Sequence, residues 1–232
     1  MRASDIQTVR ELPLFAGMSD GAFDSLLQAA FLQRFPAQAQ LIQEGEQADF
    51  LHIVVDGLVE MFTRHDGREC TIGFLSPVST FILAAVIVDK VYLQSARTLE
   101  ASRILMIPAP AIRHVFERDV SFASSVVREM AERYRGIVRQ LKDQKVRTGG
   151  ERLAAWVLRN GQEQGGALVA HVPCEKSKLA SYLGMTPETL SRSFLALERY
   201  GVKVAGRVIT CSTPAALAEL ALLDRLLDEG HD

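Results

Sequence analysis

The stretch Lys176–Glu198, KSKLASYLGMTPETLSRSFLALE, predicts two short helices joined by a tight turn. Gly184 permits the unusual backbone angles of such a turn, because glycine has no side chain that could clash with its own backbone. Thr186 is a good N-cap for the second helix, and Pro187 loses no hydrogen bond at the first helical position. The segment therefore predicts a helix-turn-helix whose second helix ends near Arg199.

The second of these helices carries a polar stripe. Glu188, Ser191 and Arg192 stand at i, i+3 and i+4, so they share one outward face of the first two turns. In the major groove of DNA an Arg can donate two bonds to guanine, a Glu can accept one from cytosine, and a Ser can serve a base or a phosphate. Alternatively, Glu188 and Arg192 simply form an exposed ion pair. The cap, the turn and the basic surroundings favour base readout. Further candidate DNA contacts are Thr186, Thr189, Lys176, Ser177 and Lys178.

Charge is segregated along the chain. The whole sequence has 26 Lys and Arg against 28 Asp and Glu, a net charge of −2. Between Lys145 and Cys211, however, ten Lys and Arg stand against five Glu and no Asp. A basic module on an acidic chain suits phosphate binding, because neutralising phosphates releases their condensed counterions.

A long helix is predicted before this module, from Asp119 to about Lys145. Its apolar residues recur at alternating steps of three and four, which is a heptad pattern. A single domain could bury such a stripe in its own core, but a seam of three heptads also suits a parallel dimer. Thr148-Gly149-Gly150 then predicts a hinge. The candidate dimer contacts are Val127, Met130, Tyr134, Ile137 and Leu141.

The N-terminal half predicts short helices in residues 5–33, with a turn at residues 12–15, and strands from Phe35 onward. Regular short strands separated by turns such as Asp56-Gly57 indicate a closed antiparallel roll. We expect two last strands, Ala96–Leu99 and Ser102–Ile107, to pair and close it.

The C-terminal part predicts a small α+β unit. A helix at Arg152–Gln162 and a strand at Leu168–Val172 precede the helix-turn-helix, and a hairpin around Gly206 follows it as a candidate wing. The tail, Ala215–Glu229, predicts one helix with a packing role only. The expected domains are a sensor roll with N-terminal helices (1–118), a dimerisation helix and hinge (119–147), and a winged helix-turn-helix with its tail (148–232).

Several classes of protein are not supported. The longest apolar run, Phe81–Val88, is far shorter than the roughly 18 residues of a membrane helix, and Asp5 and Glu11 are unlike a secretory signal. We therefore expect a cytoplasmic protein without a membrane partner. Three widely spaced cysteines predict neither a disulfide framework nor a metal site. No nucleophile–base pair or phosphate-cradling glycine loop indicates an enzyme.

The chain resembles the Crp/Fnr superfamily of transcription regulators over nearly its whole length. The similarity is clearest in Leu41–Glu46 (LIQEGE), in Leu51–Gly57 (LHIVVDG), in the Asp-Gly turn before Ile72, and in Thr186–Arg192 (TPETLSR), which resembles the recognition helix of the Fnr branch. The resemblance implies an α+β fold: an antiparallel β-roll of the cyclic-nucleotide-binding, jelly-roll kind, a long dimerisation helix and a C-terminal winged helix-turn-helix.

The resemblance also implies what such a protein binds. A homodimer would bind double-stranded DNA at an inverted repeat with TTG(A)/(T)CAA half-sites, and RNA polymerase would be a protein partner. Arg192 would contact the guanine, Glu188 the opposing cytosine side and Ser191 a neighbouring base. The alternative is an effector-binding regulatory module whose helix-turn-helix serves a protein partner and not DNA.

The predicted sensor departs from the cyclic-AMP branch, in which a Gly-Glu pair and a later Arg-Ser pair hold the ribose and phosphate. In the aligned stretch Leu83 and Ala84 replace the first pair, and Gln94-Ser95 replaces the second. Without the guanidinium, a buried phosphate would lack its counter-charge, and a Leu side chain fills the space that glycine leaves. We therefore do not expect cyclic AMP as the effector.

The effector itself stays open. An iron–sulfur cluster is not expected, because no cysteine precedes Cys70. Similarity to nitrogen-oxide-responsive relatives makes haem an alternative, with His52, His65 and His114 as candidate axial ligands, and a well-packed core is the simpler interpretation. The candidate effector pocket comprises Phe81, Ile82, Leu83, Ala84, Gln94, Ser95 and Tyr134.

Overall fold

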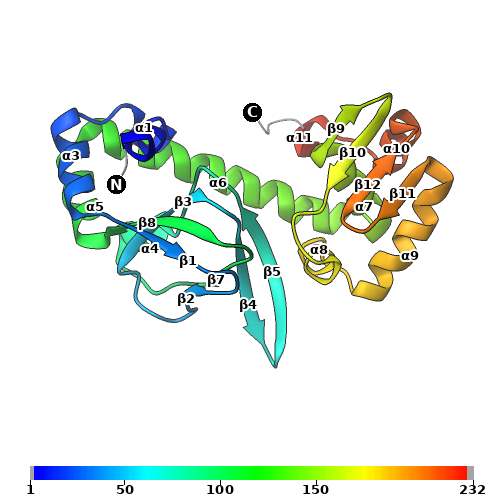
Figure 1. Ribbon diagram of the computed structural model, residues 1–232, viewed down its shortest axis with the longest axis horizontal. Helices are drawn as coiled ribbons and strands as arrows, with labels where there is room; N and C mark the ends of the chain where they lie inside the picture. The colour runs from blue at the N-terminus through cyan, green and yellow to red at the C-terminus, as the bar shows by residue number, and fades with distance from the viewer. Residues whose placement is uncertain (1–2, 229–232) are drawn as a thin grey trace. The chain divides into compact units, whose positions relative to one another are not determined.

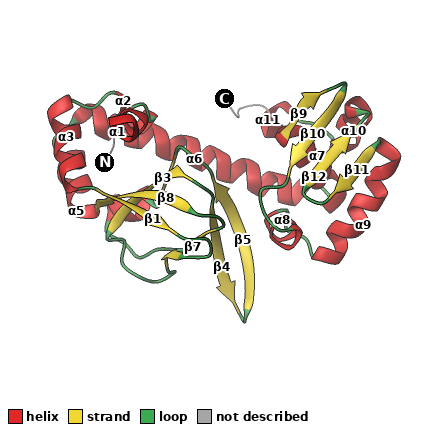
Figure 2. Cartoon of the chain, viewed as in Figure 1, coloured by secondary structure: helices red, strands yellow, loops and turns green. Residues whose placement is uncertain are grey.

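The computed structural model describes residues 3–228, and the chain folds into two compact units, residues 1–133 and residues 134 onward. Figure 1 gives the order of the elements and Figure 2 shows helices and strands in both units. One long helix, α6 (Val120–Val146), belongs to both units. The predicted α+β fold is confirmed, with a β-rich N-terminal unit, a long helix and a C-terminal helix-turn-helix.

Three helices precede the first strand: α1 (Ala3–Arg10), α2 (Pro13–Ala16) and α3 (Asp20–Ala29). The hydroxyl of Ser19 caps α3 by accepting a hydrogen bond from the N–H of Ala22. The turn expected at residues 12–15 is instead the single-turn helix α2, in which Pro13 takes the first helical position without losing a hydrogen bond.

The roll consists of two four-stranded antiparallel sheets. The first contains, in order, β1 (Phe31–Phe35), β8 (Ser102–Pro108), β3 (Phe50–Asp56) and β6 (Ser79–Phe81). The second contains β2 (Gln40–Ile42), β7 (Ser95–Thr98), β4 (Val59–His65) and β5 (Arg68–Leu75). The prediction that the last two strands pair is wrong, because the chain crosses between sheets after β7. β7 therefore pairs with β2 and β4, and β8 pairs with β1 and β3.

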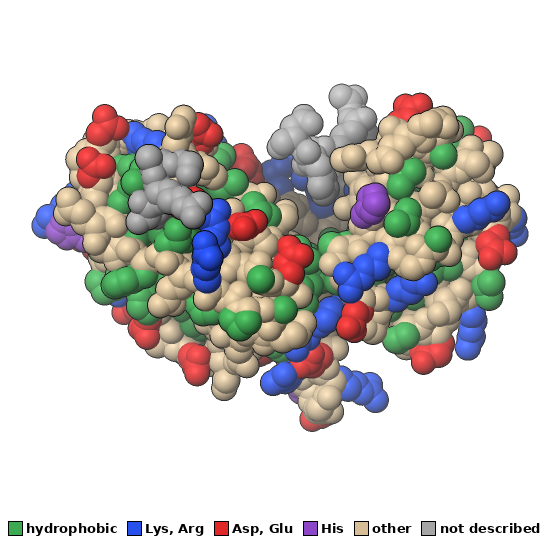
Figure 3. Space-filling view, viewed as in Figure 1, with side chains coloured by type: hydrophobic (Ala, Val, Ile, Leu, Met, Phe, Trp, Pro, Cys, Tyr) green, Lys and Arg blue, Asp and Glu red, His purple; other side chains and the backbone are tan. Residues whose placement is uncertain are grey.

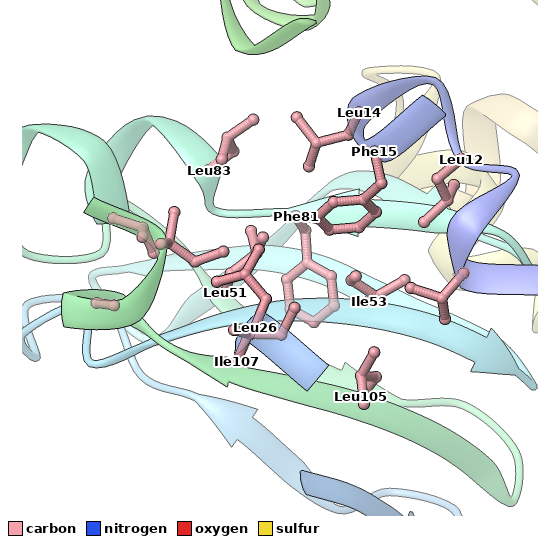
Figure 4. Packing of buried hydrophobic residues seen from close by; sticks show 14 of the residues in the cluster. Leu12, Leu14, Phe15, Leu26, Leu51, Ile53, Phe81, Leu83, Leu105 and Ile107 are labelled. Carbon is pink, nitrogen blue, oxygen red and sulfur yellow. The ribbon is translucent and has the colours of Figure 1, made fainter. Parts of the chain in front are cut away.

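The N-terminal core contains buried residues from both sheets and from the helices. Leu51 and Ile53 of β3 are paired with Ile107 and Leu105 of β8, so their side chains share one face of the sheet. Leu14, Phe15 and Leu26 of the N-terminal helices pack with this face (Figure 4). Phe122 of α6 stacks on Phe15 with ring centroids 6.0 Å apart. Two further helices, α4 (Leu83–Val88) and α5 (Ala109–Phe116), complete the unit.

The C-terminal unit begins with the end of α6. The helices that follow are α7 (Gly149–Asn160), α8 (Lys176–Tyr182), α9 (Pro187–Leu197), the 3-10 turn η1 (Glu198–Tyr200), α10 (Pro214–Ala221) and α11 (Arg225–Asp228). Its antiparallel sheet has the order β11 (Val202–Ala205), β12 (Val208–Cys211), β10 (Ala167–His171) and β9 (Gly161–Gln164). The helix predicted to reach Gln162 therefore ends at Asn160, and β9 was not predicted.

Two junctions differ from the sequence-based expectations. The hinge glycines form the first turn of α7, because Thr148 and Glu151 make a capping box there; the interruption itself lies at Arg147. The prediction of a single tail helix is wrong. Leu222 has a left-handed φ of +48°, which ends α10 and separates it from α11. Glu229, the predicted end of that helix, lies outside the described residues.

Candidate DNA-binding surface and effector region

The helix-turn-helix forms where the sequence predicts it. Gly184 has a left-handed φ of +66° in the turn between α8 and α9. The hydroxyl of Thr186 accepts a hydrogen bond from the N–H of Thr189 at 3.2 Å, which fixes the start of α9. Leu190 and Leu197 are buried on the inner face of α9. The opposite face of α9 is consequently left to solvent.

The predicted polar stripe lies on that outer face. Glu188, Ser191 and Arg192 are all exposed. The pKa of Glu188 lies below its usual value, mainly because of a hydrogen bond from the hydroxyl of Thr186. The Ser191 hydroxyl donates to the carbonyl of Pro187 at 3.0 Å, so its oxygen can still accept a bond from outside. An anionic acceptor, a hydroxyl and a guanidinium therefore face outward together.

The other predicted contacts lie around this stripe. Thr189 is exposed beside it on α9, whereas the Thr186 hydroxyl is engaged in the cap. Lys176 and Ser177 are exposed in the first turn of α8, and Lys178 is half-buried. The ammonium of Lys176 lies 5.8 Å from the centre of the Phe194 ring, which ties the start of α8 to α9.

An arginine that the sequence analysis missed holds the turn in place. The guanidinium of Arg152, on α7, donates from Nε to the carbonyl of Leu183 at 2.8 Å. Its Nη1 donates to the carbonyl of Arg147 at 2.6 Å. Arg152 therefore connects the junction after α6 with the turn that positions α9. Arg152 and Leu183 are 31 residues apart, and no local pattern in the sequence could have indicated this contact.

Further exposed basic side chains lie on η1 and on the hairpin that follows α9. Arg199 of η1, Lys203 of β11 and Arg207 at the tip of the β11–β12 hairpin are exposed. The hairpin turns at Gly206, which has a left-handed φ of +61°, and forms the predicted wing element. Figure 3 shows several Lys and Arg side chains on the visible face of the C-terminal unit, with some acidic ones among them. The sequence showed the excess of basic residues in this unit, but not where on the surface they lie.

The predicted effector residues do not share one environment. Phe81 and Leu83 are buried in the core of the roll, Ile82 and Gln94 are half-buried, and Ala84 is exposed. Ile82 has a left-handed φ of +69°, an uncommon conformation for a β-branched residue. Strain of this kind costs about 1–3 kcal/mol and is often found at ligand sites. Tyr134 belongs to the C-terminal unit and is exposed.

A network of charges in the roll was missed by the sequence analysis. Ser95 and Arg97 lie two residues apart on β7, so they share one face of the strand. The guanidinium of Arg97 donates to Glu60 at 2.7 Å and to Glu69 at 2.7 Å. Glu60 is only 1% exposed and also accepts a bond from the hydroxyl of Thr71 at 2.7 Å. The charge of Arg97 is thus matched by two carboxylates within the protein.

The hydroxyl of Ser95 is also occupied. It accepts a hydrogen bond from the backbone N–H of Glu44 at 3.0 Å. Gln94, in the position where the cyclic-AMP branch has arginine, has no charge to offer. The region around β7 therefore presents no unmatched cation to an anionic ligand among these residues.

The three candidate haem ligands differ in burial. His52 is 2% exposed, its ring lies 5.0 Å from that of Phe81, and its Nδ1 has no hydrogen-bond partner. Burial lowers the pKa of His52 from 6.5 to about 4. His65 and His114 are exposed, and Nε2 of His114 lies 2.6 Å from Arg118. Within residues 3–228 no group of three or more His, Cys, Asp or Glu side chains is arranged to hold a metal ion.

Helix α6 has two apolar faces where the sequence predicted one. Phe122 and Val126 are buried in the N-terminal core, and Met130 is half-buried against that core. Met130 therefore already has intramolecular packing, unlike the other predicted dimer contacts. Tyr134 is 68% exposed, and its neighbours along the same stripe are exposed too. The apolar residues of this uncovered stripe are Val127, Tyr134, Ile137 and Leu141.

The first half of α6 is tied to the strand that leads into the effector region. The Nε atom of Arg133 donates to the carboxylate of Glu129 at 2.7 Å. Glu129 accepts from the hydroxyl of Thr80, on β6, at 3.2 Å, and Arg133 also donates to the Thr80 carbonyl. Thr80 directly precedes Phe81. These contacts therefore connect α6 directly to the residue that precedes Phe81.

A second ionic cluster holds the end of α6 within the C-terminal unit. Arg147, which is 4% exposed, pairs with Asp143 at 2.7 Å and with Asp228 of α11 at 2.5 Å. Asp228 also accepts from Arg159, at the end of α7, at 3.0 Å. The tail therefore has a structural contact with charged groups on α6 and α7, not packing alone.

Comparison with known proteins agrees with this architecture. A family model for the cyclic nucleotide-binding domain matches residues 32–119, and one for the Crp-like helix-turn-helix domain matches residues 151–220. The two define a DNA-binding transcription regulator with a sensor domain of the cyclic-nucleotide-binding kind. Over these two regions the chain is similar to regulators of the Crp/Fnr type.

The relatives cover nearly all of the chain. The CRP-like cAMP-activated global transcriptional regulator of Mycobacterium tuberculosis is 24% identical over 90% of this chain and 96% of its own. A solved structure from Ruegeria pomeroyi, described as a cyclic nucleotide binding protein, is 26% identical with a TM-score of 0.64, over 96% and 100% of the two chains. FixK2 from Bradyrhizobium japonicum, at 21% identity and a TM-score of 0.71 over 82% and 96%, shows the shared fold. Among the described helices, none is long and apolar enough to cross a membrane.

Proposed function

We propose that this protein acts in the cytoplasm as a homodimer that binds an inverted repeat with TTG(A)/(T)CAA-like half-sites. The observation that carries the proposal is the outward stripe of Glu188, Ser191 and Arg192 on α9. Arg192 donates to the O6 and N7 of guanine, Glu188 accepts from the opposing cytosine, and Ser191 contacts a neighbouring base. Contact with RNA polymerase at the promoter completes the proposed role.

Dimerisation through α6 is supported by the uncovered apolar stripe. Residues such as Tyr134 and Ile137 lie at heptad spacing and are exposed although the helix has another apolar face buried in its own unit. A second copy of α6 would cover these side chains in a parallel coiled coil. The two recognition helices would then face two half-sites about one helical turn of DNA apart.

The proposed effector is not cyclic AMP. Leu83 is packed in the core where the cyclic-AMP branch has glycine, and Gln94 replaces its arginine. Arg97, on the strand β7 that begins directly after Gln94, is already bound by Glu60 and Glu69. A cyclic phosphate entering this region would meet carboxylates without a free counter-charge, which makes its burial costly.

Haem is a candidate effector, favoured by one observation. The imidazole of His52 is neutral, enclosed by apolar side chains, and has an unpaired Nδ1. Its close packing against Phe81 argues against it, since a bound haem would need that ring to move. The absorption spectrum of freshly purified protein tests this candidate, because a Soret band that disappears in His52→Ala would establish it.

Effector control would act through the contacts of α6. Ligand binding near β6 moves Thr80, and the Thr80–Glu129–Arg133 contacts carry that movement into the helix. Arg152 then connects the junction after α6 with the turn before α9, because its guanidinium donates hydrogen bonds to a carbonyl in each. The effector site and the DNA-binding surface are thus coupled energetically, because binding at either site biases the arrangement of α6.

Binding to short duplexes tests the proposed DNA function. Fluorescence anisotropy with an inverted-repeat duplex, a half-site duplex and a scrambled duplex is expected to show the tightest binding for the inverted repeat. Analytical ultracentrifugation of the complex should give two chains per duplex. Equal affinity for all three duplexes would instead favour the alternative in which the helix-turn-helix serves a protein partner.

A further inference from the structure

One apolar side chain lies on the outer face of the recognition helix. Leu195 follows Arg192 by three residues and Ser191 by four, so it lies on the same face of α9 as the polar stripe. Its side chain is 66% exposed. On the inner face of α9, the side chains of Leu190 and Leu197 are buried. Leu195 is therefore not needed for the packing of its own unit.

The place of Leu195 along the helix limits what it could touch in DNA. An α-helix rises 1.5 Å per residue, so Leu195 lies about 4.5 Å beyond Arg192 along the axis of α9. Stacked bases are about 3.4 Å apart along each strand. If Arg192 contacts the guanine of a half-site, Leu195 comes next to a base one or two steps away.

The chemistry of the groove then selects the partner. The edges of bases in the major groove are polar except for the 5-methyl group of thymine. We infer that Leu195 is a specificity-determining residue that packs against a thymine methyl group beside the guanine contacted by Arg192. This inference rests on the proposed function, and it accounts for the thymines of a TTG half-site, which the polar stripe does not explain.

A cycle of substitutions in the protein and in the DNA tests this pairing. Each thymine of the two half-sites is replaced by deoxyuridine, which removes only the methyl group and keeps the base pair. For one thymine position we expect affinity to fall about fourfold per half-site, the effect of one methyl group buried from water. Leu195→Ala should bind the thymine duplex more weakly and should not distinguish thymine from deoxyuridine at that position.

Leu93→Ala is the matched control, because Leu93 is 84% exposed on the N-terminal unit. This variant should keep the full sensitivity to the thymine methyl group. The inference is overturned if wild-type protein binds the inverted repeat but tolerates deoxyuridine at every thymine, or if Leu195→Ala remains as sensitive as wild type. Failure of the wild type to prefer the inverted repeat at all would instead overturn the proposed function.

Discussion

The outer face of α9 and the region around β7 differ in what they leave available to a ligand. On α9 the carboxylate of Glu188 and the guanidinium of Arg192 are exposed. On β7 the guanidinium of Arg97 and the hydroxyl of Ser95 are both bound within the protein. The comparison indicates that the polar groups of α9 are available to DNA without breaking contacts within the protein, whereas an effector must either fit the roll without its charged groups or displace them.

The largest expected effect concerns the exposed side of this comparison. Arg192→Ala should cost about 1–3 kcal/mol at each half-site, because one bidentate contact to guanine is lost. Anisotropy titrations should show this loss on the inverted repeat and little change on a scrambled duplex. Arg207→Ala, on the exposed wing, is the control and should weaken both duplexes similarly. Equal losses for Arg192→Ala on both duplexes would exclude base readout by this residue.

The next effect tests what holds the binding face in place. Asp228→Asn removes the charge that pairs with the buried Arg147, and Asp143 then remains as its partner. We expect the free energy of unfolding of the C-terminal unit to fall by about 2 kcal/mol, less than for a buried cation left wholly unpaired. Urea unfolding followed by the fluorescence of Trp156, the single tryptophan, measures it. Glu219→Gln alters an exposed carboxylate and should leave the midpoint unchanged; a similar shift in both variants contradicts the role of Asp228.

A smaller effect is expected in the roll, where a buried histidine should make the free energy of unfolding depend on pH. The pKa of His52 is about 4 in the folded protein against 6.5 when unperturbed, so the folded state binds fewer protons than the unfolded state. The stability contributed by this neutral imidazole is complete above pH 6.5 and is lost as the pH falls toward 4. Between pH 7.5 and 5.5 we expect a loss of about 1.4 kcal/mol.

Urea unfolding of the N-terminal unit at these two pH values, followed by circular dichroism, measures this loss. His52→Leu keeps an apolar side chain at the position and should remove most of the pH dependence, whatever its effect on absolute stability. Wild type and His52→Leu with the same pH dependence would show that another group is responsible.

The smallest expected effect is the response to cyclic AMP. Calorimetry at millimolar nucleotide should detect no saturable binding, since Arg97 is occupied by Glu60 and Glu69. The double variant Glu60→Gln, Glu69→Gln frees this guanidinium, and any gain of binding in that variant would identify the two carboxylates as the block. Saturable binding by the wild type at micromolar concentration contradicts our interpretation of the roll.

Local signals in the sequence were sufficient for the helix-turn-helix. Gly184, Thr186 and Pro187 act through the backbone of their own or the next few residues, so their effect is visible in a single stretch of chain. The same holds for the wing, whose turn depends on Gly206. The strands of the roll were also visible as short β-rich runs, but their partners were not, and the expected pairing of the last two strands was wrong.

Contacts between distant residues were beyond the sequence analysis. Arg152 and Leu183 are 31 residues apart, and Arg147 and Asp228 are 81 residues apart, with no periodic pattern between them. The two apolar faces of α6 were merged into one predicted seam, because spacing alone does not distinguish a side chain covered by its own unit from one left exposed. Met130, for example, is half-buried against the N-terminal core, which its spacing did not indicate.

The sequence by itself determined the class of fold, the start of the recognition helix and the side chains that α9 presents, because helix periodicity and capping act over a few residues. The tertiary structure alone decided which charges are satisfied: Arg97 is matched by Glu60 and Glu69, and Arg147 by Asp143 and Asp228. The physical reason is that burial and ion pairing depend on distances between strands and helices that no local pattern encodes.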